Sequence, residues 1–264
     1  MKKIIVLLIL IISLSNFSQQ KGLIYYGQID ALGYGEAKGI DLNSYMVFNK
    51  EQSYYVTAKD SLEKPDAGYQ TKTIAKDDGS GGVIINGMGL SPQGEQVVFN
   101  TKEKTICSNI LDRVQVYVKE DATVFDWKIL KEKKKIGKYN CRKAITHFRG
   151  RDYMAWFTLE IPVPYGPWKL NGLPGLILEA SDSEKYISWY FKKLEYPTKN
   201  KSAVVSIRKS KNEKNVKFLT IEEFKKNCEN EIQRREDKIK LVAKQFPDVT
   251  LTPPKMEDSY IERF

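Results

Sequence analysis

The side chains best suited to chemistry are few: one histidine, three cysteines and scattered carboxylates. His147 is the single histidine, so a zinc site built from two or three histidines of this chain is excluded. A Ser-His-Asp triad would have to use His147, and no G-x-S-x-G motif supplies its serine. Alternation in 140–148 puts Cys141, Lys143, Ile145 and His147 on one face of a strand, so we interpret His147 as a sheet-surface histidine.

Other catalytic signals are weak. A carboxylate pair such as Asp152 and Glu160 offers acid–base chemistry if the fold brings the two groups within about 5 Å, which their spacing does not ensure. The sequence has no G-x-x-x-x-G-K-[ST] loop, and the GSGG stretch near Gly79 lacks the strand-then-helix context of a phosphate-binding loop. No C-x-x-C pair supports a zinc ribbon or a thioredoxin-like site. We therefore predict a protein that is not an enzyme and holds neither metal nor cofactor.

The first residues predict export. Residues 1–18 have the order of a secretory signal peptide: two lysines, nine aliphatic residues at 4–12, then small and polar residues, with cleavage after Ser18 or Gln19. No cysteine lies near that point, so we expect no lipoprotein. No later segment reaches ~18 apolar residues, so no transmembrane segment is expected in the mature chain. The periplasm is the expected location, with the cell surface or the medium as alternatives.

The distribution of charge limits the classes of binding partner that we expect. Removal of the signal peptide lowers the formal net charge from +10 to +8, and the lysines are scattered, with local runs such as KEKKK at 131–135. A nucleic-acid partner is not expected; an anionic membrane surface or polysaccharide is an alternative to a solvated lysine face.

In an oxidising compartment we predict one disulfide, Cys107–Cys141, because Cys228 falls on the apolar stripe of a helix.

The elements that must position these groups are mostly strands. Between residues 22 and 207 short β-patterned runs follow one another, and the runs 44–49 and 53–58 read as a hairpin. Thr220 and Glu223 form a capping box that opens a helix reaching residue 246. Its stripe comprises Ile221, Phe224, Cys228, Ile232, Ile239, Val242 and Phe246.

This order predicts an α+β fold that is mostly β. We expect a curved antiparallel meander, half-barrel-like, packed against one long C-terminal amphipathic helix whose stripe lies on one face of the sheet. Residues 19–248 then form a single domain, and 249–264 an extended tail. Four tryptophans, Trp127, Trp156, Trp168 and Trp189, fall on or beside predicted strands. They are ordinary core residues or, alternatively, the lining of an apolar cavity between sheet and helix.

The segment 165–182, YGPWKLNGLPGLILEASD, combines turn-formers with an apolar run. Gly166-Pro167 ends the preceding strand, Asn171-Gly172 suits a tight turn with positive φ, and Pro174-Gly175 suits a second turn. The run that follows starts a new strand. Leu173 and Leu176 can tuck beneath the two turns.

These residues carry a family resemblance. The hexapeptide 172–177 spells GLPGLI, and the stretches FDWKI, KKIGKYNCRKA, FRGRDYMAWFTLEIPVPYGPWK and LILEASD around it also fit the pattern. The chain resembles the GLPGLI family of exported proteins from Bacteroidetes-type bacteria, strongly over 124–182 and loosely elsewhere. The family has no settled biochemical role. The resemblance implies a mostly β exported protein, associated with outer-membrane import systems, and no catalytic or ligand residues. The structural motif comprises Gly166, Pro167, Gly172, Leu173, Pro174, Gly175, Leu176 and Ile177.

Three functions remain open. The first is a non-catalytic binding protein for an envelope partner protein or an apolar ligand, with Trp168, Leu173 and Pro174 as an apolar lip. In the alternative reading of the same loop, Trp168 and Leu173 only fill the core. The second function is a carboxylate-dependent hydrolase of envelope glycans, which predicts two converging acidic side chains, one with a raised pKa. The third is a purely structural envelope protein.

Overall fold

The computed structural model describes residues 20–31, 40–57, 94–112, 114–199, 206–209, 216–246 and 261–263. The predicted signal peptide lies outside the described residues, as does the cleavage site. The described elements are β1 (Gly22–Asp30), β2 (Ile40–Phe48), β3 (Gln52–Thr57), β4 (Gln96–Asn100), β5 (Thr105–Asp112), β6 (Val114–Asp121), β7 (Lys128–Ile136), β8 (Tyr139–Phe148), β9 (Arg151–Thr158), β10 (Leu176–Asp182), β11 (Ile187–Glu195), β12 (Phe218–Leu219) and α2 (Ile221–Gln245).

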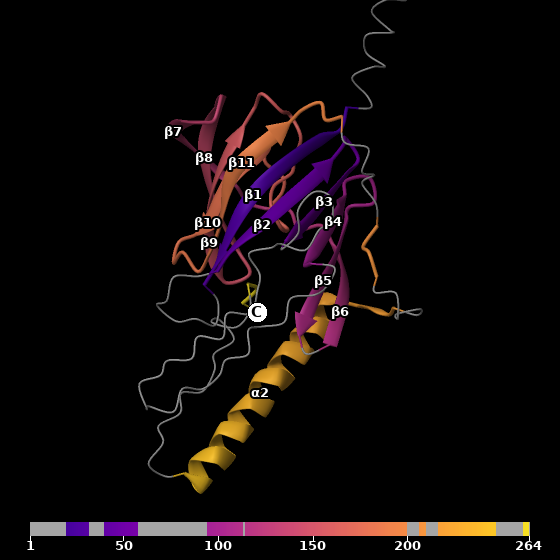
Figure 1. The fold of residues 1–264 in the computed structure, drawn as a ribbon, viewed down its shortest axis with the longest axis vertical. Coiled ribbons are helices and arrows are strands. Elements are labelled where there is room, and N and C mark those ends of the chain that lie inside the picture. Colours follow the sequence, from indigo (N-terminus) through magenta and orange to yellow (C-terminus); the bar gives the residue numbers. More distant parts are fainter. Residues whose placement is uncertain are drawn as a thin grey trace, which may run out of the picture.

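All twelve strands form one open sheet, in the order β12-β6-β5-β4-β3-β2-β1-β11-β10-β9-β8-β7 (Figure 1). It consists of two antiparallel meanders. The first runs outward from β1 to β6, and the second runs back from β7 to β11, which pairs with β1 in the middle of the sheet. The short β12 adds a parallel pair to β6. The predicted hairpin of 44–49 and 53–58 is confirmed as β2 and β3.

The sheet must curve because its second meander starts where the first one ends. Ten strand spacings separate β6 from β7 in the sheet order, about 48 Å if the sheet were flat. The connection has only six residues, 122–127, and reaches about 25 Å when fully extended. The sheet therefore curls until its two ends approach one another, and the ring of Phe125 in the connection lies 4.6 Å from that of Phe148 on β8. The predicted curved sheet is confirmed.

Each face of the sheet carries its own core. The concave face holds the larger cluster, which includes Ile24, Met46, Phe157 and Trp189. A smaller cluster on the opposite face includes Leu23, Tyr45 and Val56, and the described residue Ile207 packs on it. This double burial explains why most positions of β1 and β3 are buried, rather than every second one.

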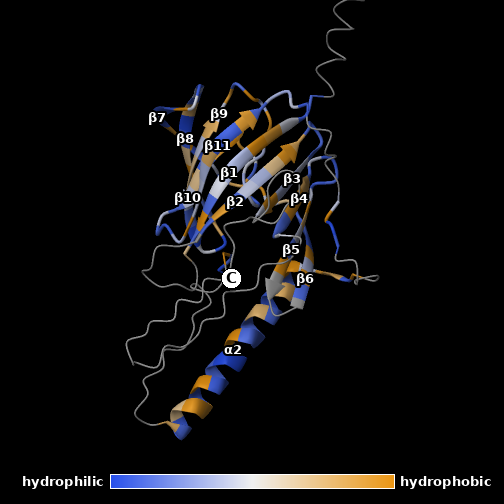
Figure 2. Cartoon of the chain, in the orientation of Figure 1, coloured by the Kyte–Doolittle hydropathy of each residue, from blue (hydrophilic) through white to orange (hydrophobic). Residues whose placement is uncertain are grey.

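The helix departs from its predicted position. The capping box of Thr220 and Glu223 is confirmed, but α2 runs away from the sheet after its first turns (Figure 1). Only Phe224, Cys228 and Glu231 of the helix are buried, against a small cluster that contains Val118 of β6. Apolar residues continue along the distal half (Figure 2), where the side chains of Val242 and Phe246 are exposed. A stripe laid along one face of the sheet was therefore the wrong arrangement, because the short β5–β6 ribbon ends before the helix does.

No helix among the described residues combines the length and the apolar character that crossing a bilayer requires.

Candidate functional site

The GLPGLI segment fills the concave side of the sheet. Between β9 and β10 the chain turns inward, and Tyr165, Leu170 and Leu173 are each at most 1% exposed within the main core. Tyr165 packs against Phe48 of β2 and Phe99 of β4, the far half of the sheet. The segment is thus the interior filling that a curved sheet of this width requires.

The three residues of the predicted apolar lip do not share a surface. Leu173 is buried, Pro174 is exposed, and Trp168 is partly buried. Trp168 stacks on Trp189 with the ring centroids 6.1 Å apart. The structure therefore supports the alternative reading, in which Trp168 and Leu173 pack in the core, and of the three only Pro174 is fully on the surface.

Trp189 in turn belongs to a buried polar network on the concave face. The side-chain oxygen of Gln28 accepts hydrogen bonds from the Tyr55 hydroxyl at 2.6 Å, the Thr57 hydroxyl at 2.5 Å and the Trp189 indole at 3.2 Å. Burial raises the pKa of Tyr55 well above its usual range, which keeps its hydroxyl protonated as a donor. The predicted cavity lined by tryptophans is thus occupied, at Trp168 and Trp189, by packed rings and satisfied polar groups.

Near this network lie two acidic groups that sequence patterns did not bring together. Burial, and the negative charge of Asp30 at the end of β1, raise the pKa of Glu95 to about 7. Glu95 directly precedes β4, and its carbonyl accepts a hydrogen bond from the Thr57 amide at 2.9 Å. These are two acidic side chains, one with a raised pKa, as the hydrolase hypothesis requires.

The raised pKa of Glu95 has a consequence for stability. The folded state holds this proton up to about pH 7, whereas the unfolded state loses it near the ordinary value of 4.5. The contribution of Glu95 to the free energy of unfolding is therefore full below pH 4.5 and declines as the pH rises to about 7. We expect Glu95→Gln to flatten the stability profile between pH 5 and 7.5, measured by urea unfolding. A variant profile that keeps the slope of the wild type would contradict this assignment.

The other pair of carboxylates considered from the sequence is not a pair. Asp152 lies at the start of β9, and Glu160 lies beyond its end, about 25 Å away along the strand direction. Glu160 instead accepts a hydrogen bond from the Asn140 amide at 2.8 Å. Joint acid–base chemistry by Asp152 and Glu160 is therefore excluded.

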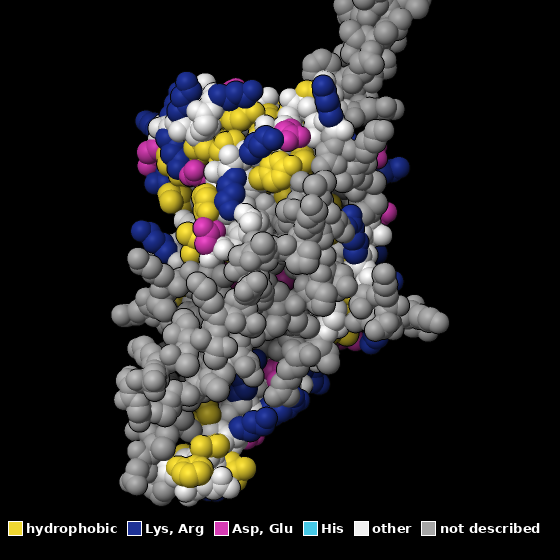
Figure 3. Space-filling view, viewed as in Figure 1, with side chains coloured by type: hydrophobic (Ala, Val, Ile, Leu, Met, Phe, Trp, Pro, Cys, Tyr) yellow, Lys and Arg dark blue, Asp and Glu magenta, His cyan; other side chains and the backbone are white. Residues whose placement is uncertain are grey.

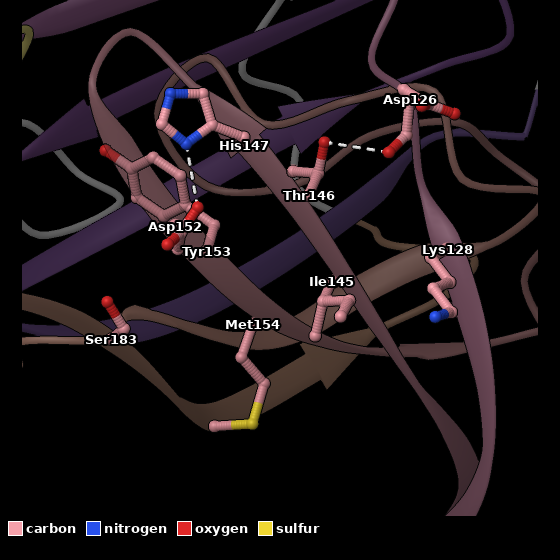
Figure 4. A pocket seen from close by; sticks show the side chains of 9 residues that line it. All are labelled: Asp126, Lys128, Ile145, Thr146, His147, Asp152, Tyr153, Met154 and Ser183. Carbon is pink, nitrogen blue, oxygen red and sulfur yellow. Dashed lines mark hydrogen bonds and ion pairs between the residues drawn. The ribbon is translucent and has the colours of Figure 1, made fainter.

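Asp152 has a different partner. Its carboxylate lies 2.7 Å from Nδ1 of His147, across the β8–β9 hairpin, and both side chains are exposed. The two residues form one rim of a shallow surface pocket of about 460 Å³ between β7, β8 and β9 (Figure 4). Its lining is Asp126, Lys128, Ile145, Thr146, His147, Asp152, Tyr153, Met154 and Ser183. Ser183 lies on the other side of Asp152 from the imidazole in Figure 4, so the three side chains are not arranged as a triad.

The predicted disulfide is wrong. Cys107 on β5 and Cys141 on β8 are both free, and seven strands lie between their strands in the sheet order. Cys107 packs with the cluster on the outer face around β1 to β4, whereas Cys141 belongs to the main core. Burial raises the pKa of the Cys141 thiol to about 11, so that it stays protonated at neutral pH. Cys228 is buried on the helix, as predicted.

Sequence patterns missed a buried ionic cluster under the motif segment. Lys169 is 1% exposed in its side chain and donates to Glu120 of β6 and to Glu262 near the C-terminus, both at 2.5 Å. Arg149 contacts the same two carboxylates. A lysine inside an apolar, turn-rich segment was the one signal that could have indicated an internal ion pair.

No cluster of three or more histidine, cysteine, aspartate or glutamate side chains in the described part of the chain is placed to hold a metal ion.

Comparison with known proteins supports the family resemblance in one segment. A family model described as "Protein of unknown function (Porph_ging)" matches residues 149–179, which contain the GLPGLI hexapeptide. The GLPGLI-type resemblance is confirmed over this segment. No curated protein matches the sequence.

Two solved structures resemble the fold. "Structure of PNGF-II in P21 space group" has a TM-score of 0.49 and 14% identity and covers 79% of this chain and 33% of its own. "Structure of PNGF-II in C2 space group" has a TM-score of 0.48 and 16% identity and covers 79% of this chain and 32% of its own. The chain thus spans about a third of the length of PNGF-II.

Proposed function

We propose that this is an exported, non-catalytic binding protein of the cell envelope, and that the exposed edge of β7 binds an extended acidic segment of a partner protein. The observation that carries the proposal is the character of this edge. Among the described strands, β7 pairs with β8 alone and ends the sheet. The outward edge of such a strand offers backbone N–H and C=O groups to an added strand.

The charge of β7 indicates what kind of strand its edge would bind. The strand, KILKEKKKI, contains five lysines and one glutamate in nine residues, and Lys131, Lys133 and Lys135 are exposed. Lys and Arg side chains gather at the end of the molecule where β7 and β8 lie (Figure 3). Lysine side chains on an edge strand disfavour the addition of a basic strand, because like charges repel. They also disfavour a neutral strand, because the ammonium groups would lose hydration without gaining a counter-charge. An acidic strand is therefore the favoured partner.

Apolar contacts are available beside this edge. Ile129 of β7 and Ile145 of β8 are both 37% exposed, and Ile145 lines the pocket of Figure 4 with the partly exposed Met154. Side chains of an added segment that point toward the sheet could occupy this pocket. The filled concave side, by contrast, gives no support to a carrier of apolar ligands, since the motif segment occupies the interior.

A defined peptide tests the proposal. We expect a fluorescent peptide of alternating glutamate and valine to bind the mature protein, measured by anisotropy at low salt, and to bind less as salt increases. The Lys131→Gln, Lys133→Gln, Lys135→Gln variant should bind at least about tenfold more weakly, a loss of about 1.4 kcal/mol.

The controls separate strand addition from general charge attraction. The same charge change elsewhere, in Lys238→Gln, Lys240→Gln, Lys244→Gln, should leave binding within about twofold, because those exposed lysines lie on the distal half of α2, which runs away from the sheet. A peptide with alternate backbone amides N-methylated keeps its charge but cannot donate along one edge, and should not bind. Equal loss in both triple variants, or equal binding of the methylated peptide, would contradict the proposal.

One observation favours a second candidate, a carboxylate-dependent hydrolase of envelope glycans. The pKa of about 7 at Glu95, beside the charge of Asp30, suits a general acid at neutral pH. This candidate predicts release of soluble sugars from envelope glycans by the mature protein, abolished in Glu95→Gln and in Asp30→Asn. No release by the wild-type protein would exclude it for the glycans tested.

A further inference from the structure

A short C-terminal segment lies against the β8–β9 turn with the contacts of a bound peptide. Residues 261–263, Ile-Glu-Arg, are described at this position (Figure 1). Two contacts involve only their backbone: the Arg263 amide donates to the Arg149 carbonyl at 3.0 Å, and Nε of Arg151 donates to the Ile261 carbonyl at 2.8 Å. Contacts of this kind hold an extended chain whatever its side chains are.

The side chains add selectivity at each of the three positions. Ile261 packs on the main core. The Glu262 carboxylate accepts from Nζ of Lys169 and from Arg149, each at 2.5 Å. The Arg263 guanidinium donates to the Glu184 carboxylate at 2.5 Å and lowers the pKa of that carboxyl.

The residues that receive this segment are also held by contacts outside it, since Lys169 pairs with Glu120 and Arg151 with Asp182. Lys169 comes from the motif segment and is 1% exposed, and Arg151 is held by a buried ion pair with Asp182 at 3.0 Å. Gly150 has a φ of +72°, and a Cβ on it would lie 2.6 Å from Cβ of Arg263. The turn therefore leaves room where the segment passes.

We propose that the β8–β9 turn, with Lys169 and Glu184, is a peptide-recognition site that reads an extended apolar–Glu–Arg segment, and that the C-terminal residues of the chain occupy it as a ligand in cis. The central glutamate is the specificity determinant. It is 4% exposed and enters a site in which Lys169 and Arg149 bring two positive charges against the single carboxylate of Glu120. Without Glu262 the site has a surplus positive charge, which another carboxylate of the same kind can neutralise.

The test uses the full chain with its own 261–263 segment weakened by substitution, and adds the same segment as a separate peptide. The probe is an acetylated Tyr-Ile-Glu-Arg-Phe peptide, measured by calorimetry against the Glu262→Gln, Arg263→Ala variant. We expect binding with one peptide per chain, and at least tenfold weaker binding to the wild-type protein, whose site is filled. A peptide with glutamine in place of glutamate should bind the variant at least tenfold more weakly.

Absence of binding to a folded variant, or equal binding of the two peptides, would overturn the proposal. If the variant does not fold, amide hydrogen exchange of full-length Gly150→Ala decides instead. The substitution places a methyl group against Arg263, so the Arg263 amide should exchange at least tenfold faster than in the wild type, while amides of β1 and β11 stay unchanged. An unchanged Arg263 amide would overturn the proposal.

Discussion

Replacing Lys169 with methionine should lower the free energy of unfolding by about 3–5 kcal/mol. The ammonium group of Lys169 is almost fully buried between the carboxylates of Glu120 and Glu262, each 4% exposed. Methionine has a similar volume and carries no charge. Its introduction leaves two buried carboxylates that share the guanidinium of Arg149 alone. Urea unfolding followed by tryptophan fluorescence measures the loss.

The same substitution at a surface ion pair is the matched control. Lys134 contacts Glu179, but its side chain is 37% exposed, so we expect Lys134→Met to cost less than about 1 kcal/mol. Neutralising one carboxylate as well, in Lys169→Met, Glu262→Gln, leaves Arg149 paired with Glu120 and should recover part of the loss. Equal costs for Lys169→Met and Lys134→Met would show that the buried cluster does not stabilise the fold.

Replacing Gly175 with alanine should lower the free energy of unfolding by about 3 kcal/mol. A Cβ at this position would lie 2.1 Å from the Thr158 carbonyl oxygen and 2.8 Å from its carbon. Both are backbone atoms at the end of β9, so no side-chain rotation can relieve the overlap. The motif segment and β9 would have to separate, which disturbs the pairing of Leu176 with Thr158.

Gly172 provides the comparison within the same motif. It has a φ of +89°, but the nearest atoms to an added Cβ, in the Trp127 ring, are 3.9 Å away. Gly172→Ala should therefore cost only the left-handed backbone penalty of about 1–2 kcal/mol. A larger loss at Gly172 than at Gly175 would contradict the claim that close packing against Thr158 makes Gly175 the more constrained glycine of the motif.

Local patterns in the sequence predicted local structure well. The β2–β3 hairpin, the capping box of Thr220 and Glu223 and the positive φ of Gly172 each depend on residues within a few positions of one another. The curved, mostly antiparallel sheet followed from the spacing of strand signals. The positive φ of Trp168, 53°, had no such signal, because no glycine or asparagine occupies the position.

Long-range contacts could not be predicted in this way. Lys169 meets Glu120 and Glu262 across 49 and 93 residues, and nothing in the local pattern of any of the three indicates the others. The amphipathic stripe of α2 showed which side of the helix is apolar but not how far its partner extends. The disulfide was inferred by eliminating Cys228, which says nothing of the distance between Cys107 and Cys141.

The central claim is that the GLPGLI segment builds the interior while β7 presents the binding surface. Photo-crosslinking in producing cells tests it most directly, with a photoreactive amino acid at exposed Lys133 of β7 or at exposed Pro174 of the motif. We predict a discrete crosslinked partner from position 133 and none from position 174. A partner captured from position 174 but not from position 133 would contradict the account.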